Sequence, residues 1–284
     1  MRRSFRGKVR GYLRSPGSFL LLLLVWLAAA VTLFALLYLI AYILIKGVPY
    51  LTPSLFAWEY NSENVSMMPA IITTVEMTLL SLLIAAPLGV LTAVYLVEYA
   101  KRGSRIVEAI RLTAETLSGI PSIVYGLFGM LFFVTALGWG LTILAGACTL
   151  AIMILPLIIR TTEEALKSVP DTYREGSFGL GAGKLRTVFR IVLPSAVPGV
   201  LAGIILAIGR IVGETAALIY TAGTVAKVPE DVMSSGRTLA VHMYALSSEG
   251  FHTDEAYATA VILLLLVLVI NTISAALARR LTKA

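Results

Sequence analysis

The sequence contains little cysteine, little histidine and little charge. Among its 284 residues there are one cysteine, Cys148, and two histidines. One cysteine excludes an internal disulfide framework and a cysteine-rich metal site, and two histidines are too few for a zinc centre built from histidine. Charged residues make up 14% of the chain, whereas about a quarter is usual in soluble proteins. Too few polar residues remain to cover a water-soluble fold of this length, which excludes a soluble enzyme, a disordered chain and a fibrous protein.

Apolar residues dominate instead, since 58% of the chain is hydrophobic and its mean hydropathy is +0.89. A helix needs roughly 20 apolar residues to cross the ~30 Å hydrocarbon layer of a membrane. Six stretches meet this requirement: Ser18–Ile45, Pro69–Val97, Thr113–Leu137, Leu141–Ile159, Pro194–Ile219 and Ala256–Leu277. The first is much longer than the roughly 7–15 apolar residues of a cleaved signal peptide. The sequence therefore predicts an all-α polytopic membrane protein with six transmembrane helices, surrounded by membrane lipid.

The charges between the six stretches predict an orientation. The segments that would share one side with the N-terminus carry 19 basic and 6 acidic residues, and those on the other side carry 3 basic and 7 acidic residues. Because Lys and Arg collect in cytoplasmic loops, we expect both termini to be cytoplasmic. Residues 1–17 then form a basic cytoplasmic arm, and residues 18–284 form one membrane domain. This asymmetry accounts for the formal charge of +7 without nucleic acid.

The sequence shows no constellation for catalysis. Gly179 to Lys184 looks at first like a phosphate-binding loop, but a Walker loop needs a glycine five residues before Gly183, where Phe178 stands, and Ser or Thr after the lysine, where Leu185 stands. Clustered metal ligands and catalytic triads are also absent from the sequence. We expect a non-catalytic transport subunit that binds no metal or cofactor, with another chain supplying any energy.

The longest loop on the basic side, residues 160–190, reads as a helix, a glycine turn and a second helix. Its spacing resembles the cytoplasmic signature of binding-protein-dependent ABC importer permeases, with Gly-Ser in place of Ala-Ala. The residues that match are Glu175-Gly176-Ser177, then Gly181, then Ile191, then Leu193-Pro194. The resemblance implies that residues 171–183 couple the chain to an ATPase that uses ATP and Mg, through Glu175, Gly176, Ser177 and Gly181. The alternative is an amphipathic surface helix that only borders the membrane.

The fifth stretch carries two charges, Arg210 and Glu214. A charge inside a membrane usually faces the interior of a helix bundle or a watery path, and a spacing of four places both side chains on one helical face. The planar fork of arginine matches oxyanions. A carboxylate beside it tolerates an oxyanion that keeps a proton at pH 7, as phosphate does and sulfate does not. We expect a substrate pathway here, with a structural or gating ion pair as the alternative.

Other features of the spans leave alternatives open. Pro121 is expected to kink the third span, and with Ser122 it either lines a cavity or marks a simple bend. Glu76 either pairs with Arg210, faces a cavity or is protonated. The Gly-xxx-Gly pairs of the fifth span predict close packing, within the chain or against a second permease. On the other side of the membrane, His242 and His252 are expected to be solvated.

Three strings of residues resemble PstA-type phosphate importer permeases, over residues 65–284. They are Gly209-Arg210-Ile211-Val212-Gly213-Glu214-Thr215-Ala216, Gly119 to Phe128, and Ala86-Pro87-Leu88-Gly89-Val90 followed by Tyr95 to Tyr99. The resemblance implies a type I ABC importer permease in the bacterial inner membrane. It also implies a PstC-like second permease, a PstB-like ATPase dimer and a PstS-like external phosphate-binding protein. The rival functions are a permease for sulfate or molybdate and an ion-coupled secondary transporter.

Overall fold

The structure, a computed structural model, describes residues 16–101 and 103–281, and within these residues it consists of helices without strands. Five helices are long and apolar enough to cross a membrane, or six crossings result if a bent pair of helices counts as one. The predicted all-α membrane fold is thus confirmed. The basic arm, residues 1–17, lies outside the described residues except for its last two positions.

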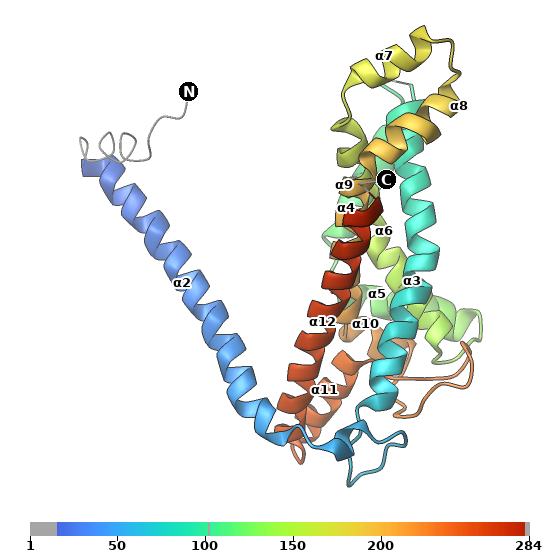
Figure 1. The fold of residues 1–284 in the computed structure, drawn as a ribbon. Helices are drawn as coiled ribbons and strands as arrows, with labels where there is room; N and C mark the ends of the chain where they lie inside the picture. Colours follow the sequence, from blue (N-terminus) through green and yellow to red (C-terminus); the bar gives the residue numbers. More distant parts are fainter. Residues whose placement is uncertain (1–15, 102, 282–284) are drawn as a thin grey trace.

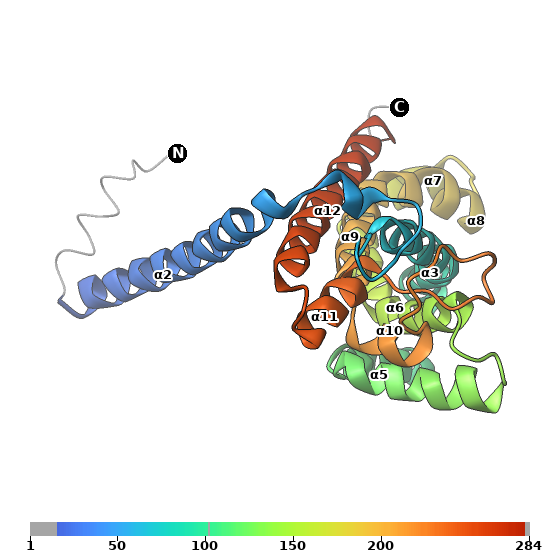
Figure 2. The same cartoon turned by 90° about the horizontal axis from the view of Figure 1, so that it is seen from below.

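The first helix, α2 (Pro16–Gly47), stands apart from the other helices (Figures 1 and 2). It touches the bundle near its end, where Tyr42 meets the ring of Tyr257 edge-on at 5.8 Å and Gly47 lies against the Tyr257 backbone. Tyr257 belongs to the last helix, α12 (Thr253–Leu281). Most of the apolar side chains of α2 are therefore exposed within this chain, so the bundle itself does not need them for its core.

The core lies around α6 (Ile143–Lys167), which packs between α3 (Met68–Val94) and α9 (Leu193–Val212). The buried residues Leu150, Ile154 and Ile158 lie on its inner face. Hydroxyl groups on α3 donate to backbone carbonyls one turn earlier, as Thr73 does to Pro69 at 2.9 Å. Such local bonds allow polar side chains on α3 inside the bundle because these hydroxyls are paired with backbone carbonyls.

The third predicted span, Thr113–Leu137, is a broken helix rather than one continuous helix. Its first part belongs to α4 (Arg105–Ser118), and the chain then turns by 104° into α5 (Ser122–Gly129) and the π-helical η4 (Met130–Ala136). The reason is Pro121, which disfavours helical backbone at the residue before it and cannot donate a helical hydrogen bond. The two segments are long and apolar enough to cross a membrane only when they are counted together.

The fifth predicted span, Pro194–Ile219, is also interrupted. A nearly continuous helix runs from α8 (Lys184–Thr187) through the π-helical η5 (Val188–Val192) into α9, which ends at Val212. A second short helix, α10 (Ala216–Thr221), follows after a break of three residues. The helix α11 (Leu239–Glu249) and the start of α12 lie near α10, at the same end of the bundle (Figure 1). The predicted second, fourth and sixth spans correspond to α3, α6 and α12.

The first glycine pair of α9 packs within the chain, which favours the first of the two readings left open above. A Cβ added at Gly199 would lie 2.6 Å from the Ala165 side chain, and one added at Gly203 would lie 2.0 Å from Thr161 Oγ1. Both neighbours belong to α6. At Gly209, by contrast, an added Cβ would meet nothing within 4 Å. The close approach of α9 to α6 thus depends on Gly199 and Gly203 and does not involve Gly209.

This contrast predicts the outcome of two matched substitutions in one helix. Gly203→Ala forces α9 away from α6 and should lower the free energy of unfolding by about 1–3 kcal/mol, the usual cost of overpacking. Gly209→Ala meets no neighbour and adds helix propensity, so it should not lower that free energy. Thermal unfolding of the two purified variants in detergent checks this. Equal destabilisation by both would contradict the packing described here.

Candidate functional site

The helix α7 (Asp171–Gly179) lies at the end of the bundle where α8 begins (Figure 1). Pro170 precedes its first residue, and the acidic Asp171 lies in its first turn, where the helix dipole favours negative charge. Gly181 then turns the chain with a φ of +81°, a backbone conformation that glycine adopts without strain. The sequence therefore fixes a short helix with a definite start and stop, as predicted, rather than a flexible linker.

Arg174 holds α7 onto the membrane helices. Its guanidinium forms an ion pair with Glu98, with Nη2 to Oε1 at 2.7 Å, and only 15% and 8% of the two side chains are exposed. The same guanidinium donates to the carbonyl of Leu166, in the last turn of α6, at 3.0 Å and to that of Val169, just after α6, at 2.8 Å. Glu98 belongs to the π-helical η3 (Tyr95–Tyr99), which continues α3. One side chain of α7 thus joins α3 and α6.

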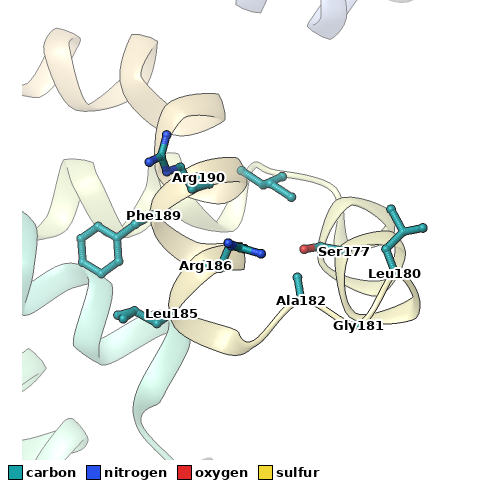
Figure 3. Close-up of a pocket in the computed structure, with 9 residues that line it drawn as sticks. Ser177, Leu180, Gly181, Ala182, Leu185, Arg186, Phe189 and Arg190 are labelled. Atoms are coloured by element: carbon teal, nitrogen blue, oxygen red, sulfur yellow. The ribbon is translucent and has the colours of Figure 1, made fainter.

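The four predicted coupling residues do not share one surface. Glu175, Gly176 and Gly181 are exposed, but Ser177 is buried, and its hydroxyl lies 2.8 Å from the hydroxyl of Thr187 on α8. The expectation that Ser177 belongs to the outer coupling surface is therefore wrong, because it joins α7 to α8. Figure 3 shows Ser177 directed toward α8 and Leu180 directed away from it. Leu180 is 91% exposed and adds to the outer surface an apolar contact that the sequence did not single out.

A groove of about 800 Å³ lies between α7 and the helix formed by α8 and η5. Its far wall carries Leu185, Arg186, Phe189 and Arg190 (Figure 3). The exposed apolar residues Leu185 and Phe189 stand beside two cations. This end of the bundle therefore offers both a projecting helix and a recess beside it.

Arg210 lines a cavity of about 330 Å³ between α4, α6 and α9. Gly203 of α9 lies against Thr161 of α6, and Arg210 follows seven residues later, about 10 Å further along the helix axis. This places its backbone near the middle of α6. No ion pair within 4.0 Å involves Arg210 among residues 16–101 and 103–281. Its charge is thus available to the cavity.

The cavity contains two further arginines that the sequence analysis missed. Arg111 on α4 lies 2.5 Å from Glu163, which also binds Lys167 at 2.6 Å. Arg160 lies 3.2 Å from Glu164, and both of these side chains are largely exposed. Three arginine side chains therefore line one small space together with the carboxylates of Glu115 and Glu163. Ion pairs with Glu163 and Glu164 balance Arg111 and Arg160. The bend at Pro121 is what brings α4 beside α6, and this bend was the only sequence signal for the arrangement.

Glu214 does not lie beside Arg210 on a helix, as the sequence analysis predicted. The helix ends at Val212, and Glu214 lies in the break before α10. Its carboxylate is buried and accepts a hydrogen bond from the backbone N–H of Ala217 at 3.0 Å. The spacing of four residues fails because Gly213 and Thr215 interrupt the helix, so Glu214 caps a helix start instead of facing Arg210.

The other predicted residues lie outside the Arg210 cavity. Pro121 produces the bend but does not line the cavity, and neither does Ser122 or Glu76. Among the described residues, no ion pair joins Glu76 to Arg210. The prediction that His242 is solvated is wrong, since its side chain is fully buried at the end of the bundle opposite α7. The apolar residues of α11 on either side of His242 carried the signal for this burial.

Known proteins are similar to this sequence over most of its length. The family model described as "Binding-protein-dependent transport system inner membrane component" matches residues 85–284. A probable ABC transporter permease protein, YqgI, of Bacillus subtilis is 36% identical over 86% of this chain and 89% of its own. The phosphate transport system permease protein PstA of Pasteurella multocida is 34% identical over 89% of this chain and 91% of its own.

Solved structures share the fold. A chain of a bacterial alginate ABC transporter superposes with a TM-score of 0.64 at 18% identity, covering 91% of this chain and 96% of its own. A chain of the MetNI methionine ABC transporter, in an inward-facing conformation, superposes with a TM-score of 0.59 at 20% identity, covering 76% and 94%. The fold is therefore that of a type I ABC importer permease. With the family model matching most of its length, the chain belongs to the binding-protein-dependent transport system inner membrane components, the membrane-embedded permeases of ABC importers.

Proposed function

We propose that the chain is a transmembrane permease subunit of an ATP-driven importer for inorganic phosphate. The relatives named as phosphate permeases support this cargo, and one of them matches nearly the whole chain. The family supports a transport subunit that works with an ATPase and an external binding protein. In this proposal ATP hydrolysis takes place in the separate ATPase, the chain binds no cofactor of its own, and the permease domain extends over residues 18–284, with its family core at 65–284.

The observation that carries the cargo assignment is Arg210 in its cavity. The backbone of Arg210 lies near the middle of α6, and its side chain lines a cavity with two other arginines. Among the described residues no ion pair within 4.0 Å involves its guanidinium. An arginine fork binds a tetrahedral oxyanion through two parallel hydrogen bonds. Glu214 holds the start of α10 at the end of the same helix, so its role in the pathway is to shape the break rather than to bind phosphate directly.

The orientation follows from charge. The start of α2, the end of α12 and the helix α7 lie toward the same end of the molecule (Figure 1). That end carries the excess of Lys and Arg, which favours the cytoplasmic side of the bacterial inner membrane for both termini. The exposed Glu175, Gly176, Gly181 and Leu180 then face the ATPase, and Arg174 carries the displacement of α7 to α3 and α6.

A second permease chain, a PstC-like partner, completes the pathway in this proposal. The support within this chain is α2, which lies apart from the bundle with its apolar side chains uncovered (Figure 2). A PstB-like ATPase dimer binds at the α7 end, and a PstS-like phosphate-binding protein delivers the cargo at the opposite end. One chain alone then forms only half of the translocation pathway.

Uptake of labelled phosphate by cells with and without the gene tests the cargo. The proposal predicts that high-affinity uptake disappears with the gene and that excess sulfate or molybdate does not compete. If sulfate or molybdate competes and phosphate does not, the chain is a permease for another oxyanion. If uptake needs an ion gradient but no ATPase, the chain is a secondary transporter. Either result would overturn the proposal.

A further inference from the structure

A buried cation lies at the end of the bundle opposite α7. The side chain of Arg237 is only 6% exposed, just before the start of α11. Its backbone N–H donates to the Val225 carbonyl at 3.1 Å, and the N–H of Leu239 donates to Thr74 Oγ1 at 2.8 Å. These bonds fix the start of α11 against α3 and the neighbouring loop. The position of Arg237 is therefore determined by the fold and does not depend on an ion pair.

The free hydrogen-bond donors of Arg237 have a particular geometry. Nε and Nη2 are buried and have no hydrogen-bond partner among the residues that the structure describes. These two nitrogens form one edge of the guanidinium, and their N–H groups point in parallel, which is the arrangement that binds two oxygens of an oxyanion. An arginine that served only to fill space would not leave this edge unpaired, because each unmet buried donor of a charged group costs more free energy than a neutral one.

No negative charge near Arg237 compensates it. The acidic residues on α3, on α11 and on the neighbouring segments are Glu59, Glu63, Glu76, Glu230, Asp231, Glu249, Asp254 and Glu255. Within the part of the chain that the structure describes, none forms an ion pair with Arg237 within 4.0 Å. The adjacent start of α11 adds a positive dipole end, which disfavours a cation. The place therefore concentrates positive potential, which suits an anion and opposes a purely structural arginine.

Two aromatic side chains surround the guanidinium. The Tyr60 ring lies under Arg237, with 4.6 Å from Cζ to the ring centre, and the His242 ring meets Tyr60 edge-on at 6.1 Å. Burial lowers the pKa of His242 to about 3, and the charge of Arg237 acts in the same direction. The Val65 carbonyl opposes this, although its geometry falls short of a hydrogen bond. At neutral pH the imidazole is uncharged, and one of its nitrogens can accept a hydrogen bond from a ligand.

The loop that carries Tyr60 covers this cluster in a strained conformation. Val65 has a φ of +38°, which is costly for a β-branched residue. The Asn61 side chain accepts hydrogen bonds from the N–H groups of Glu63 and Asn64, and the Asn64 side chain accepts one from Ser66, so the loop is held in place. Backbone strain of this kind persists where the surroundings enforce it, and it is common at ligand sites.

We propose that Arg237, with Tyr60 and His242, forms a second oxyanion site at the end of the bundle opposite α7. Arg237 donates through Nε and Nη2, the Tyr60 ring packs against the guanidinium, and neutral His242 accepts a hydrogen bond from the O–H of a protonated oxyanion. The site is separate from the Arg210 cavity, which none of these three residues lines. That the oxyanion is phosphate rests on the proposed function. The site would receive the cargo on the external side before it reaches Arg210.

Equilibrium binding of labelled inorganic phosphate to the purified permease–ATPase complex, without binding protein or nucleotide, tests this site. An Arg210→Met background isolates the second site. In that background, Arg237→Met should weaken the remaining binding by roughly 10- to 100-fold, as expected for losing two charge-assisted hydrogen bonds. Lys227→Met removes a charge from an exposed side chain on the same loop system and should change binding less than about twofold, since exposed charges are screened.

Arg237→Lys keeps the charge but loses the planar guanidinium, so it should also weaken phosphate binding. This variant replaces Arg237→Met in the test if the methionine variant fails to assemble. If phosphate binds equally well to the Arg210→Met complex with Arg237, with Arg237→Lys and with Arg237→Met, the second site is disproved. The proposed function as a phosphate permease is not affected by that result. The second site is also disproved if the Arg210→Met complex binds no phosphate at all. If sulfate binds through Arg237 and phosphate does not, the second site stands and the phosphate assignment fails. The two inferences are thereby separated.

Discussion

Replacing Arg210 by alanine is expected to reduce phosphate uptake by roughly 10- to 100-fold while the assembled complex remains at its normal amount. Arg210 has no ion-pair partner among the described residues, and it lines the cavity between α4, α6 and α9. Removing it leaves no buried carboxylate without a counter-charge, so the fold should tolerate the change. The variant lacks the guanidinium that, in this proposal, donates hydrogen bonds to the oxyanion in place of water.

The measurement is the initial rate of labelled phosphate uptake, compared with the amount of complex recovered from the same membranes. Arg210→Lys is the matched variant, because it keeps the charge and loses the fork. We expect it to retain more uptake than Arg210→Ala and less than wild type. Normal uptake by the alanine variant would remove Arg210 from the pathway. Loss of uptake together with loss of the complex would show a structural role instead.

Arg174→Ala is expected to separate ATP hydrolysis from transport. Arg174 is the side chain of α7 that joins Glu98 and the end of α6, and its pair with Glu98 is largely buried. Removing one partner of a buried ion pair costs about 3–5 kcal/mol because the other charge is left uncompensated. In this protein that cost is expected to loosen α7 from α3 and α6. The ATPase would then still bind α7 and hydrolyse ATP, but its movement would no longer reach the pathway.

The decisive quantity is the ATP hydrolysed per phosphate transported in proteoliposomes, which should rise severalfold. Asp171→Asn is the matched control, since Asp171 is 86% exposed and binds the same guanidinium at 3.1 Å. An exposed pair contributes little, so this ratio should stay unchanged. Glu98→Gln combined with Arg174→Ala should show strong non-additivity. If Arg174→Ala lowers hydrolysis and transport by the same factor, the contact supports folding or docking and does not transmit movement.

The sequence predicted the spans well where one helix carries the whole apolar run. It also placed the turn at Gly181, because proline, an acidic first turn and glycine mark the ends of α7. Breaks inside apolar runs were not predictable in the same way. The apolar pattern of the sequence continues through the break around Gly213 and gives no sign of it. Glu214 was therefore predicted to lie on a helix face that it does not occupy. Pro121 signalled a bend, but not that α4 would lie beside α6.

Contacts between distant segments were beyond the sequence. Glu98 and Arg174 are separated by 76 positions, and each belongs to a stretch whose own pattern explains it as a charge near the membrane surface. His242 was misjudged because the segment between α10 and α12 is polar on average, although α11 within it buries several of its residues. Pairings of this kind follow from how helices pack together, and one sequence read by itself does not contain them.

The most direct test of the account is phosphate accumulation by proteoliposomes that contain the purified complex, with ATP inside and the external binding protein outside. We expect accumulation of labelled phosphate that needs ATP, needs the binding protein, and is insensitive to excess sulfate. The Arg210→Ala complex should accumulate almost none. Accumulation that ignores ATP, or a cargo other than phosphate, would contradict the assignment of this chain as a permease of a phosphate importer.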